Sequence, residues 1–192
     1  MAFVKTEVQG AVEIITIDRP KALNALNPEV LADLKAAFEA VDQNTIRCIV
    51  LTGEGDKSFV AGADIGSMST MTKAEGEAFG KLGNDVFLMI ESFPVPVIAA
   101  VNGFALGGGN ELAMSCDIRI CSDNAVFGQP EVGLGITPGF GGTQRLARLV
   151  GMGMAKQLVY SALNIKADEA YRIGLVNAVY PQAELMENVL KL

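Results

Sequence analysis

The chain has 192 residues, half of them hydrophobic, and its 15 basic and 22 acidic side chains give a formal net charge of −7. A chain of this length is typical of one domain with a sizeable core that needs no disulfides or metals. The acidic balance argues against a nucleic-acid partner and an anionic membrane surface, because both require a positive field.

Histidine is absent from the sequence. This excludes a Ser-His-Asp triad, a Cys-His nucleophile and a His-ligated metal site, so acid–base chemistry is left to carboxylates.

The three cysteines, Cys48, Cys116 and Cys121, show no repeated spacing and are interpreted as buried reduced thiols. The N-terminus lacks the features of a signal peptide, and no apolar run approaches the ~18 residues of a membrane span. We therefore expect a cytoplasmic protein.

In the first half of the chain, hydrophobic patterns and capping residues predict five elements. Asn27 and Pro28 are a typical helix start, and Thr72 with Glu75 forms a capping box. The segment 53–68 is expected to be a loop. The predicted elements are a hairpin of residues 2–8 and 11–17, a helix over 28–42, a strand over 48–51, and a long helix that starts after Thr72 and stops at Pro94.

The second half repeats the order of strand, loop and helix, which is typical of an α/β fold built from recurring β-β-α units. Residues 1–192 are expected to form one domain. The predicted elements are strands over 97–101, 118–121, 126–128 and 175–179, and helices around 110–114 and over 142–150, 152–161, 167–173 and 182–191.

Glycines gather where predicted strands pass into helices, at Gly62, at residues 107–109 and at residues 139–142. Backbone N–H groups at such points can face an oxyanion or a phosphate. Taken alone, each cluster is explained better by a tight turn than by a ligand site. Neither a P-loop motif nor a dinucleotide-binding glycine motif is present.

Two glutamates lie in apolar, glycine-rich surroundings. Glu111 is on the first turn of a predicted helix, and Glu131 lies in the uncharged stretch of residues 127–135. Burial would raise the pKa values of both carboxyls and suit them to act as an acid–base pair. For Glu111, a solvated glutamate favoured by the helix dipole is the alternative.

Four segments in this order resemble the successive signatures of the crotonase (enoyl-CoA hydratase/isomerase) family, and most of all its short-chain members. They are residues 19–26 (RPKALNAL), 58–65 (SFVAGADI), 99–112 and 127–145. The resemblance runs through the whole chain. It implies a spiral of β-β-α units, usually assembled as trimers that pair into hexamers.

The resemblance also implies a chemistry. The backbone N–H groups of Ala63 and Gly108 would bind the oxygen of an acyl-CoA thioester as negative charge develops on it. Glu111 and Glu131 would hold a water molecule, whose oxygen adds to C3 of an enoyl-CoA while a proton is added at C2. Neither a metal nor a redox cofactor is implied, and coenzyme A enters only as part of the substrate.

For the coenzyme A moiety, the resemblance implies contacts with the loop over residues 61–66, whose members are Ala61, Gly62, Ala63, Asp64, Ile65 and Gly66. Lys21 would lie near the nucleotide phosphates, although it could equally be an exposed turn lysine. The Asp64 carboxylate is expected to fix the turn rather than to react.

The sequence departs from the family pattern at two places. Asn110 stands where many relatives have cysteine, a small polar replacement that should not remove the chemistry. Family members also continue past the equivalent of Leu192 with helices that pack on a neighbouring subunit, so the domain is expected to be truncated at its C-terminus.

The alternatives to a hydratase are a double-bond isomerase, a thioester hydrolase or an inactive CoA-binding fragment. The presence of both glutamates favours the hydratase over the isomerase, because isomerases of the family commonly keep only one of the two carboxylates.

Overall fold

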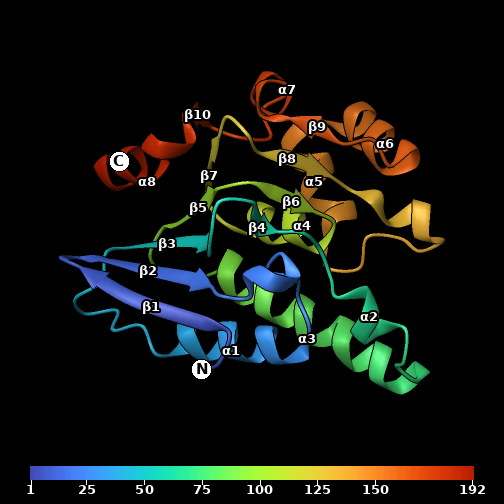
Figure 1. The fold of residues 1–192 in the computed structure, drawn as a ribbon, viewed down its shortest axis with the longest axis horizontal. Coiled ribbons are helices and arrows are strands. Elements are labelled where there is room, and N and C mark those ends of the chain that lie inside the picture. The colour runs from blue at the N-terminus through green and yellow to red at the C-terminus, as the bar shows by residue number, and fades with distance from the viewer.

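The computed structural model describes residues 1–192, and the larger of its two sheets has six strands in the order β1-β2-β3-β5-β7-β10 (Figure 1). β1 and β2 form an antiparallel hairpin, and every other neighbouring pair in this sheet is parallel. The strands are β1 (Val4–Gln9), β2 (Val12–Ile17), β3 (Cys48–Gly53), β5 (Val97–Val101), β7 (Ile118–Ser122) and β10 (Ala178–Tyr180).

The smaller sheet has the order β4-β6-β8-β9, formed by β4 (Ser58–Val60), β6 (Phe104–Leu106), β8 (Val126–Gly128) and β9 (Ile165–Lys166). β4, β6 and β8 run parallel, and β9 is antiparallel to β8. Each successive pair, β3 with β4, β5 with β6 and β7 with β8, contributes one strand to each sheet before a helix follows. This repetition is the predicted spiral of β-β-α units.

Helices cover both faces of the larger sheet. In Figure 1, α1 and α3 lie together on one side of it, and α8 lies on the opposite side beside β10. No helix is both long enough and apolar enough to cross a membrane. The α-helices are α1 (Pro28–Glu39), α2 (Ile65–Met68), α3 (Lys73–Glu91), α4 (Gly108–Ser115), α5 (Gly142–Val150), α6 (Met152–Ser161), α7 (Ala167–Arg172) and α8 (Leu185–Lys191), and the 3-10 helices are η1 (Pro20–Ala22), η2 (Pro130–Leu134) and η3 (Gln182–Glu184).

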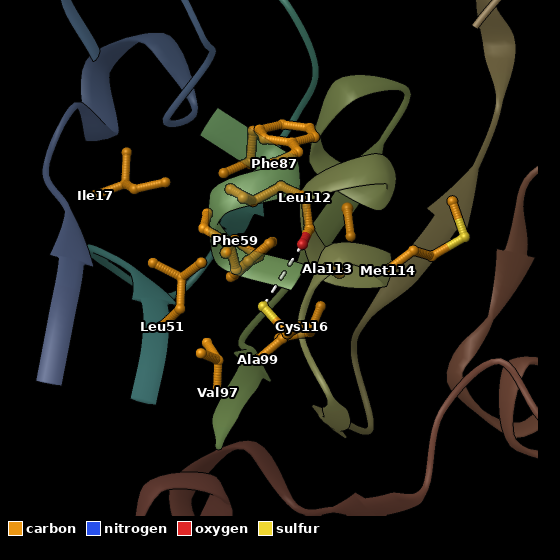
Figure 2. Close-up of a cluster of buried hydrophobic side chains, with 14 of the residues drawn as sticks. Ile17, Leu51, Phe59, Phe87, Val97, Ala99, Leu112, Ala113, Met114 and Cys116 are labelled. Carbon is orange, nitrogen blue, oxygen red and sulfur yellow. Dashed lines mark hydrogen bonds between the residues drawn. The ribbon is translucent and has the colours of Figure 1, made fainter. Parts of the chain in front are cut away.

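The alternation of side chains along the central strands produces two separate clusters. Leu51 and Ala99 point into the main core with α1, α3 and α4, whereas Val50 and Ile98 point to the face that α8 covers. Figure 2 shows part of the main core, where side chains of the larger sheet meet those of β4, α3 and α4. Strands buried on both faces explain why the sequence reads there as continuous apolar runs.

The cysteines are free thiols, as predicted. Cys121 in β7 is buried, as expected, whereas Cys48 at the start of β3 is only half-buried, contrary to the prediction. Cys116 is buried at the end of α4, where its thiol donates a hydrogen bond to the Leu112 carbonyl (Figure 2).

Elements with strong local signals form where they are predicted. The Asn27 side chain accepts a hydrogen bond from the Val30 N–H, and the capping box of Thr72 and Glu75 starts α3. α5 and α6 cover the predicted residues 142–150 and 152–161. α1 is shorter than expected and ends at Glu39.

Elements that depend on distant partners are predicted less well. Residues 53–68 are not simply a loop, because they contain β4 and α2, and the strands β6 and β9 were not expected. These strands have two or three residues each, too few to show a period. The predicted strand over 175–179 is also misplaced. Leu175 and Val176 donate backbone hydrogen bonds to the Ala170 carbonyl at the end of α7, and the strand begins at Ala178.

Candidate active site

Three parallel strands of the smaller sheet end at the same edge, and each leads into a segment of the candidate site. β4 leads into the loop that contains Ala63, β6 into Gly107 and the start of α4, and β8 into Gln129 and η2. Ligands of α/β proteins commonly bind outside the carboxyl ends of parallel strands. The topology thus explains how residues far apart in the sequence reach one place.

A cavity of about 540 Å³ lies at this edge. Its lining includes all four of the residues predicted to take part in the chemistry, Ala63, Gly108, Glu111 and Glu131. Apolar side chains from α2, α3, the loop after η2 and the turn before α5 supply much of the remaining wall, among them Met68, Phe79, Ile136 and Phe140. The four residues therefore share one largely apolar chamber.

The start of α4 requires glycine. Gly107 has φ 50° and ψ −120°, a conformation that L side chains avoid, and a Cβ there would lie 2.9 Å from Glu131 Oε1. At Gly109 a Cβ would overlap the Val60 carbonyl oxygen of β4. The triple glycine thus serves both the tight turn and the close packing of α4 on β4.

The backbone N–H groups of Ala63 and Gly108 donate no hydrogen bond within the protein. Ala63 is aligned by its neighbours, because the Leu26 N–H donates to the Gly62 carbonyl at 2.8 Å and the Asp64 N–H donates to the Leu26 carbonyl at 2.7 Å. Gly108 is the first residue of α4, where N–H groups have no partner in the helix. Two fixed, unpaired donors that border an apolar cavity suit the binding of a carbonyl oxygen that gains charge.

Glu111 is held by the backbone. Its Oε1 accepts hydrogen bonds from the N–H groups of Phe140 at 2.9 Å and Gly142 at 2.6 Å. Only 1% of the residue is exposed, and burial raises the pKa of the carboxyl to about 7, although the Gly142 N–H opposes the shift. The nearby charge of Glu131 raises the pKa further. The position is therefore not that of a solvated helix-start glutamate.

Glu131 is held by a side chain. Its Oε1 accepts a hydrogen bond from Gln129 Nε2 at 3.2 Å, and its buried Oε2 has no partner within the protein. Burial raises the pKa of this carboxyl as well. Two carboxyls whose pKa values are raised by burial and that line one cavity can serve as an acid–base pair.

Several residues at the site were not singled out by sequence reasoning. Gln129 is fully buried, and its Oε1 accepts a hydrogen bond from Asn110 Nδ2 at 2.9 Å, which extends the hydrogen bonds of Glu131 into the protein. The glycine cluster of residues 139–142 was predicted to present N–H groups to a bound oxyanion, and the N–H groups of Phe140 and Gly142 instead donate to the Glu111 carboxylate. The one available signal was the polar residue Gln129 between the apolar strand β8 and a proline.

The residues predicted to meet coenzyme A divide into two sets. Ala61, Ala63 and Ile65 line the cavity, whereas Lys21, Asp64 and Gly66 do not. Lys21 is exposed on η1 and makes no hydrogen bond or ion pair with another side chain.

Asp64 stabilises the loop in which it lies. Its carboxylate accepts a hydrogen bond from the Ser67 N–H at 3.1 Å and pairs with Arg19 Nη1 at 2.7 Å. The Arg19 guanidinium lowers the pKa of this carboxyl. Asp64 therefore caps α2 and ties the loop to the segment before η1.

Comparison with known proteins shows the family to which the chain belongs. The model of the enoyl-CoA hydratase/isomerase family matches residues 7–192, and the chain belongs to this family. The chain is 64% identical over 181 residues to a short-chain-enoyl-CoA hydratase of Clostridium acetobutylicum, covering 94% of this chain and 69% of the relative. It is 59% identical over 187 residues to a crotonyl-CoA hydratase of Syntrophomonas wolfei, covering 97% and 72%.

Solved structures show the same fold. The crystal structure of an enoyl-CoA hydratase from Bacillus anthracis superposes with a TM-score of 0.96 at 38% identity, and the match covers 98% of this chain and 74% of that one. An enoyl-CoA hydratase from Thermoplasma volcanium gives a TM-score of 0.93 at 40% identity over 98% of this chain and 76% of the other. The predicted crotonase-like fold is thereby confirmed.

Proposed function

We propose that this protein is a short-chain enoyl-CoA hydratase, which adds water reversibly to the 2,3 double bond of crotonyl-CoA to form 3-hydroxybutyryl-CoA. The observation that carries the proposal is the meeting of two unpaired backbone donors and two buried glutamates in one apolar cavity. The names of the two relatives with about 60% identity point to the same reaction.

The thioester oxygen is bound by the N–H groups of Ala63 and Gly108. As the water oxygen attacks C3, the electron pair of the double bond moves toward the carbonyl, and negative charge collects on the thioester oxygen. Donors already fixed at that position stabilise the charge without reorganisation, and one such donor is typically worth about 2.7–4 kcal/mol of barrier.

Protons are moved by the glutamate pair. The ionised carboxylate takes one proton from the attacking water, and the protonated carboxyl delivers one to C2, so that the elements of one water molecule are added. Dehydration reverses each step. Hydration is redox-neutral, so the proposed reaction requires no redox cofactor, and the two backbone donors and the glutamate pair account for each step without a metal. Acid–base help of this kind typically contributes about 10²- to 10⁴-fold in rate.

Coenzyme A is proposed to lie along the loop of residues 61–66, with the Lys21 ammonium near its phosphates. The support is the chain path, since the Ala61 N–H donates to the Leu23 carbonyl at 3.1 Å and residues 61–64 run beside the segment that carries Lys21. For assembly we propose a homotrimer or a dimer of trimers when the C-terminal helices of the family are present. For location we propose the cytoplasm, without nucleic-acid or membrane partners. Analytical ultracentrifugation tests the assembly.

The direct test is the loss of conjugated-enoyl absorbance when the purified protein meets crotonyl-CoA. We expect turnover, with 3-hydroxybutyryl-CoA as the product by mass spectrometry. Release of free thiol would point instead to thioester hydrolysis, and movement of the double bond without added water to isomerisation. A folded protein that binds the thioester without turnover would contradict the proposal.

A further inference from the structure

The turn that holds Glu111 is itself held from its other side by an arginine. Arg145 lies on the first turn of α5, and its Nη1 donates a hydrogen bond to the Phe140 carbonyl at 2.9 Å. The N–H of Phe140 and that of Gly142 are the two donors to Glu111 Oε1. The same turn is therefore bound by the carboxylate through its N–H groups and by the guanidinium through a carbonyl.

The guanidinium is anchored to a second element. Its Nε and Nη2 donate to Glu91 Oε2, at the end of α3, at 3.1 and 2.7 Å. The Arg145 side chain is 9% exposed and that of Glu91 is 49% exposed, so the ion pair lies at the edge of the protein with its cation inside. A buried guanidinium needs such partners, because an unpaired charge there would be strongly destabilising.

Glycine lets the guanidinium approach the turn. Gly141 has φ 96°, and a Cβ at this position would overlap Arg145 Nη1. At Gly142 a Cβ would lie 2.8 Å from Glu111 Oε1 and 2.7 Å from Gln129 Nε2. The two glycines thus allow a cation on one side of the turn and a carboxylate on the other, each in contact with the main chain.

We propose that Arg145 is a positioning residue for the reaction, which fixes Glu111 by locking residues 140–142 between α3 and α5. The inference rests on the proposed hydratase function. Arg145 does not line the cavity, so it acts through the turn rather than on the substrate. Without the arginine the turn can relax, and the two N–H groups that donate to Glu111 Oε1 then move. A small displacement of a catalytic group can cost about 10²-fold in rate.

The pH dependence of turnover distinguishes a positioning role of Arg145 from a purely structural one. The charged groups that act on Glu111 are Glu131, which raises its pKa, and Arg145, which lowers it together with the two N–H donors. A displaced turn and a lost cation both favour the protonated carboxyl. A positioning role therefore moves the pH dependence of turnover, whereas a loss of stability alone does not.

The experiment compares Arg145→Gln with Arg148→Gln. Arg148 is a matched control on the same helix, exposed, with hydrogen bonds only to Gln144 one turn earlier. We measure kcat and KM for crotonyl-CoA from pH 5 to 9, and we check folding by circular dichroism. For R145Q we expect kcat to fall about tenfold to a hundredfold with KM changed less than about threefold, and the whole pH profile of kcat, its acid limb included, to move to higher pH. R148Q should match the wild type.

Wild-type turnover separates the two hypotheses. If the wild type does not hydrate crotonyl-CoA, the proposed function fails. If it does, and R145Q keeps the kcat and the acid limb of R148Q, the positioning role is overturned.

Should R145Q not fold, Glu91→Gln and Arg145→Lys carry the test. E91Q keeps the arginine but weakens its anchor, so we expect a smaller decrease in kcat and a smaller shift of the acid limb in the same direction. R145K keeps the positive charge but lacks the planar guanidinium group. We expect its kcat and its acid limb to lie between those of the wild type and those of R145Q. Wild-type kcat and an unmoved limb in both variants would overturn the role.

Discussion

The two carboxylates of the candidate site are held by different kinds of groups. Glu111 accepts two backbone N–H groups from the turn before α5, whereas Glu131 accepts one side-chain N–H from Gln129 and keeps Oε2 without a partner. A backbone donor is fixed by the path of the chain, but a side-chain donor can be removed by one substitution. The geometry of Glu111 is thus a property of the fold, and that of Glu131 depends on a neighbouring residue.

The largest effect is expected when the negative charge of either glutamate is removed. We expect Glu111→Gln and Glu131→Gln each to lower kcat by about 10²- to 10⁴-fold while crotonyl-CoA binding persists, because both groups move a proton. Glu29→Gln is the matched control, since Glu29 is also a first-turn glutamate but is exposed on α1. Steady-state kinetics and calorimetric binding provide the readouts. Retained turnover in either site variant would contradict the paired mechanism.

The second test concerns the pH dependence of stability. The pKa of Glu111 is raised from 4.5 to about 7, so the folded protein binds this proton more tightly than the unfolded chain does. Its contribution to stability is complete below about pH 4.5 and is lost as the pH rises through 7, by on the order of 3 kcal/mol. Urea unfolding at pH 5 and pH 8 should show a smaller decrease for Glu111→Gln than for the wild type. Equal decreases would mean that Glu111 titrates normally.

The third test moves Glu111 without changing it. Gly142→Ala places a methyl group 2.8 Å from Glu111 Oε1, 2.9 Å from Glu111 Cγ and 2.7 Å from Gln129 Nε2, so these two buried side chains must move. We expect kcat to fall about a hundredfold, with a loss of stability of about 1–3 kcal/mol from overpacking. Gly133→Ala on η2 is the control, because a Cβ there meets nothing within 4 Å. Identical kinetics of the two variants would show that the position of Glu111 tolerates displacement.

The smallest effect is expected on the side of Glu131. Gln129→Leu removes the single N–H donor to this carboxyl and leaves the Asn110 amide without its acceptor. We expect kcat to fall about tenfold, because a hydrogen bond to a charged group is typically worth about 1.5–3 kcal/mol. Gln129→Met, which keeps the length of the side chain but has no N–H donor, separates loss of the donor from loss of packing. If Gln129→Leu keeps the wild-type rate, the donor does not position Glu131.

Much of the architecture follows from local sequence. Asn27 and Pro28 start α1 and Thr72 and Glu75 start α3, because a helix cap is made by residues close in the chain. The apolar runs of β3 and β5 form strands whose partners are distant, but each run is long enough to be recognised as buried from the sequence. The order of the motifs also sufficed to predict the family, and the resemblance pointed to four of the residues that line the cavity. The two glutamates and the glycine turns can be found from the sequence, because a charged residue in an apolar stretch and a cluster of glycines are both recognisable by residue type.

Only the tertiary structure decided how these residues act together. β4, β6 and β9 are too short to have a pattern and exist because distant strands pair with them. The donors to Glu111 are main-chain groups at positions 140 and 142, and the contact of Arg145 with Glu91 joins helices 54 residues apart. A side chain can be read from the sequence, but the direction of an N–H group is set by the path of the chain. The sequence by itself thus determined which residues could do the chemistry, and the packing of the strands and turns decided how they are held.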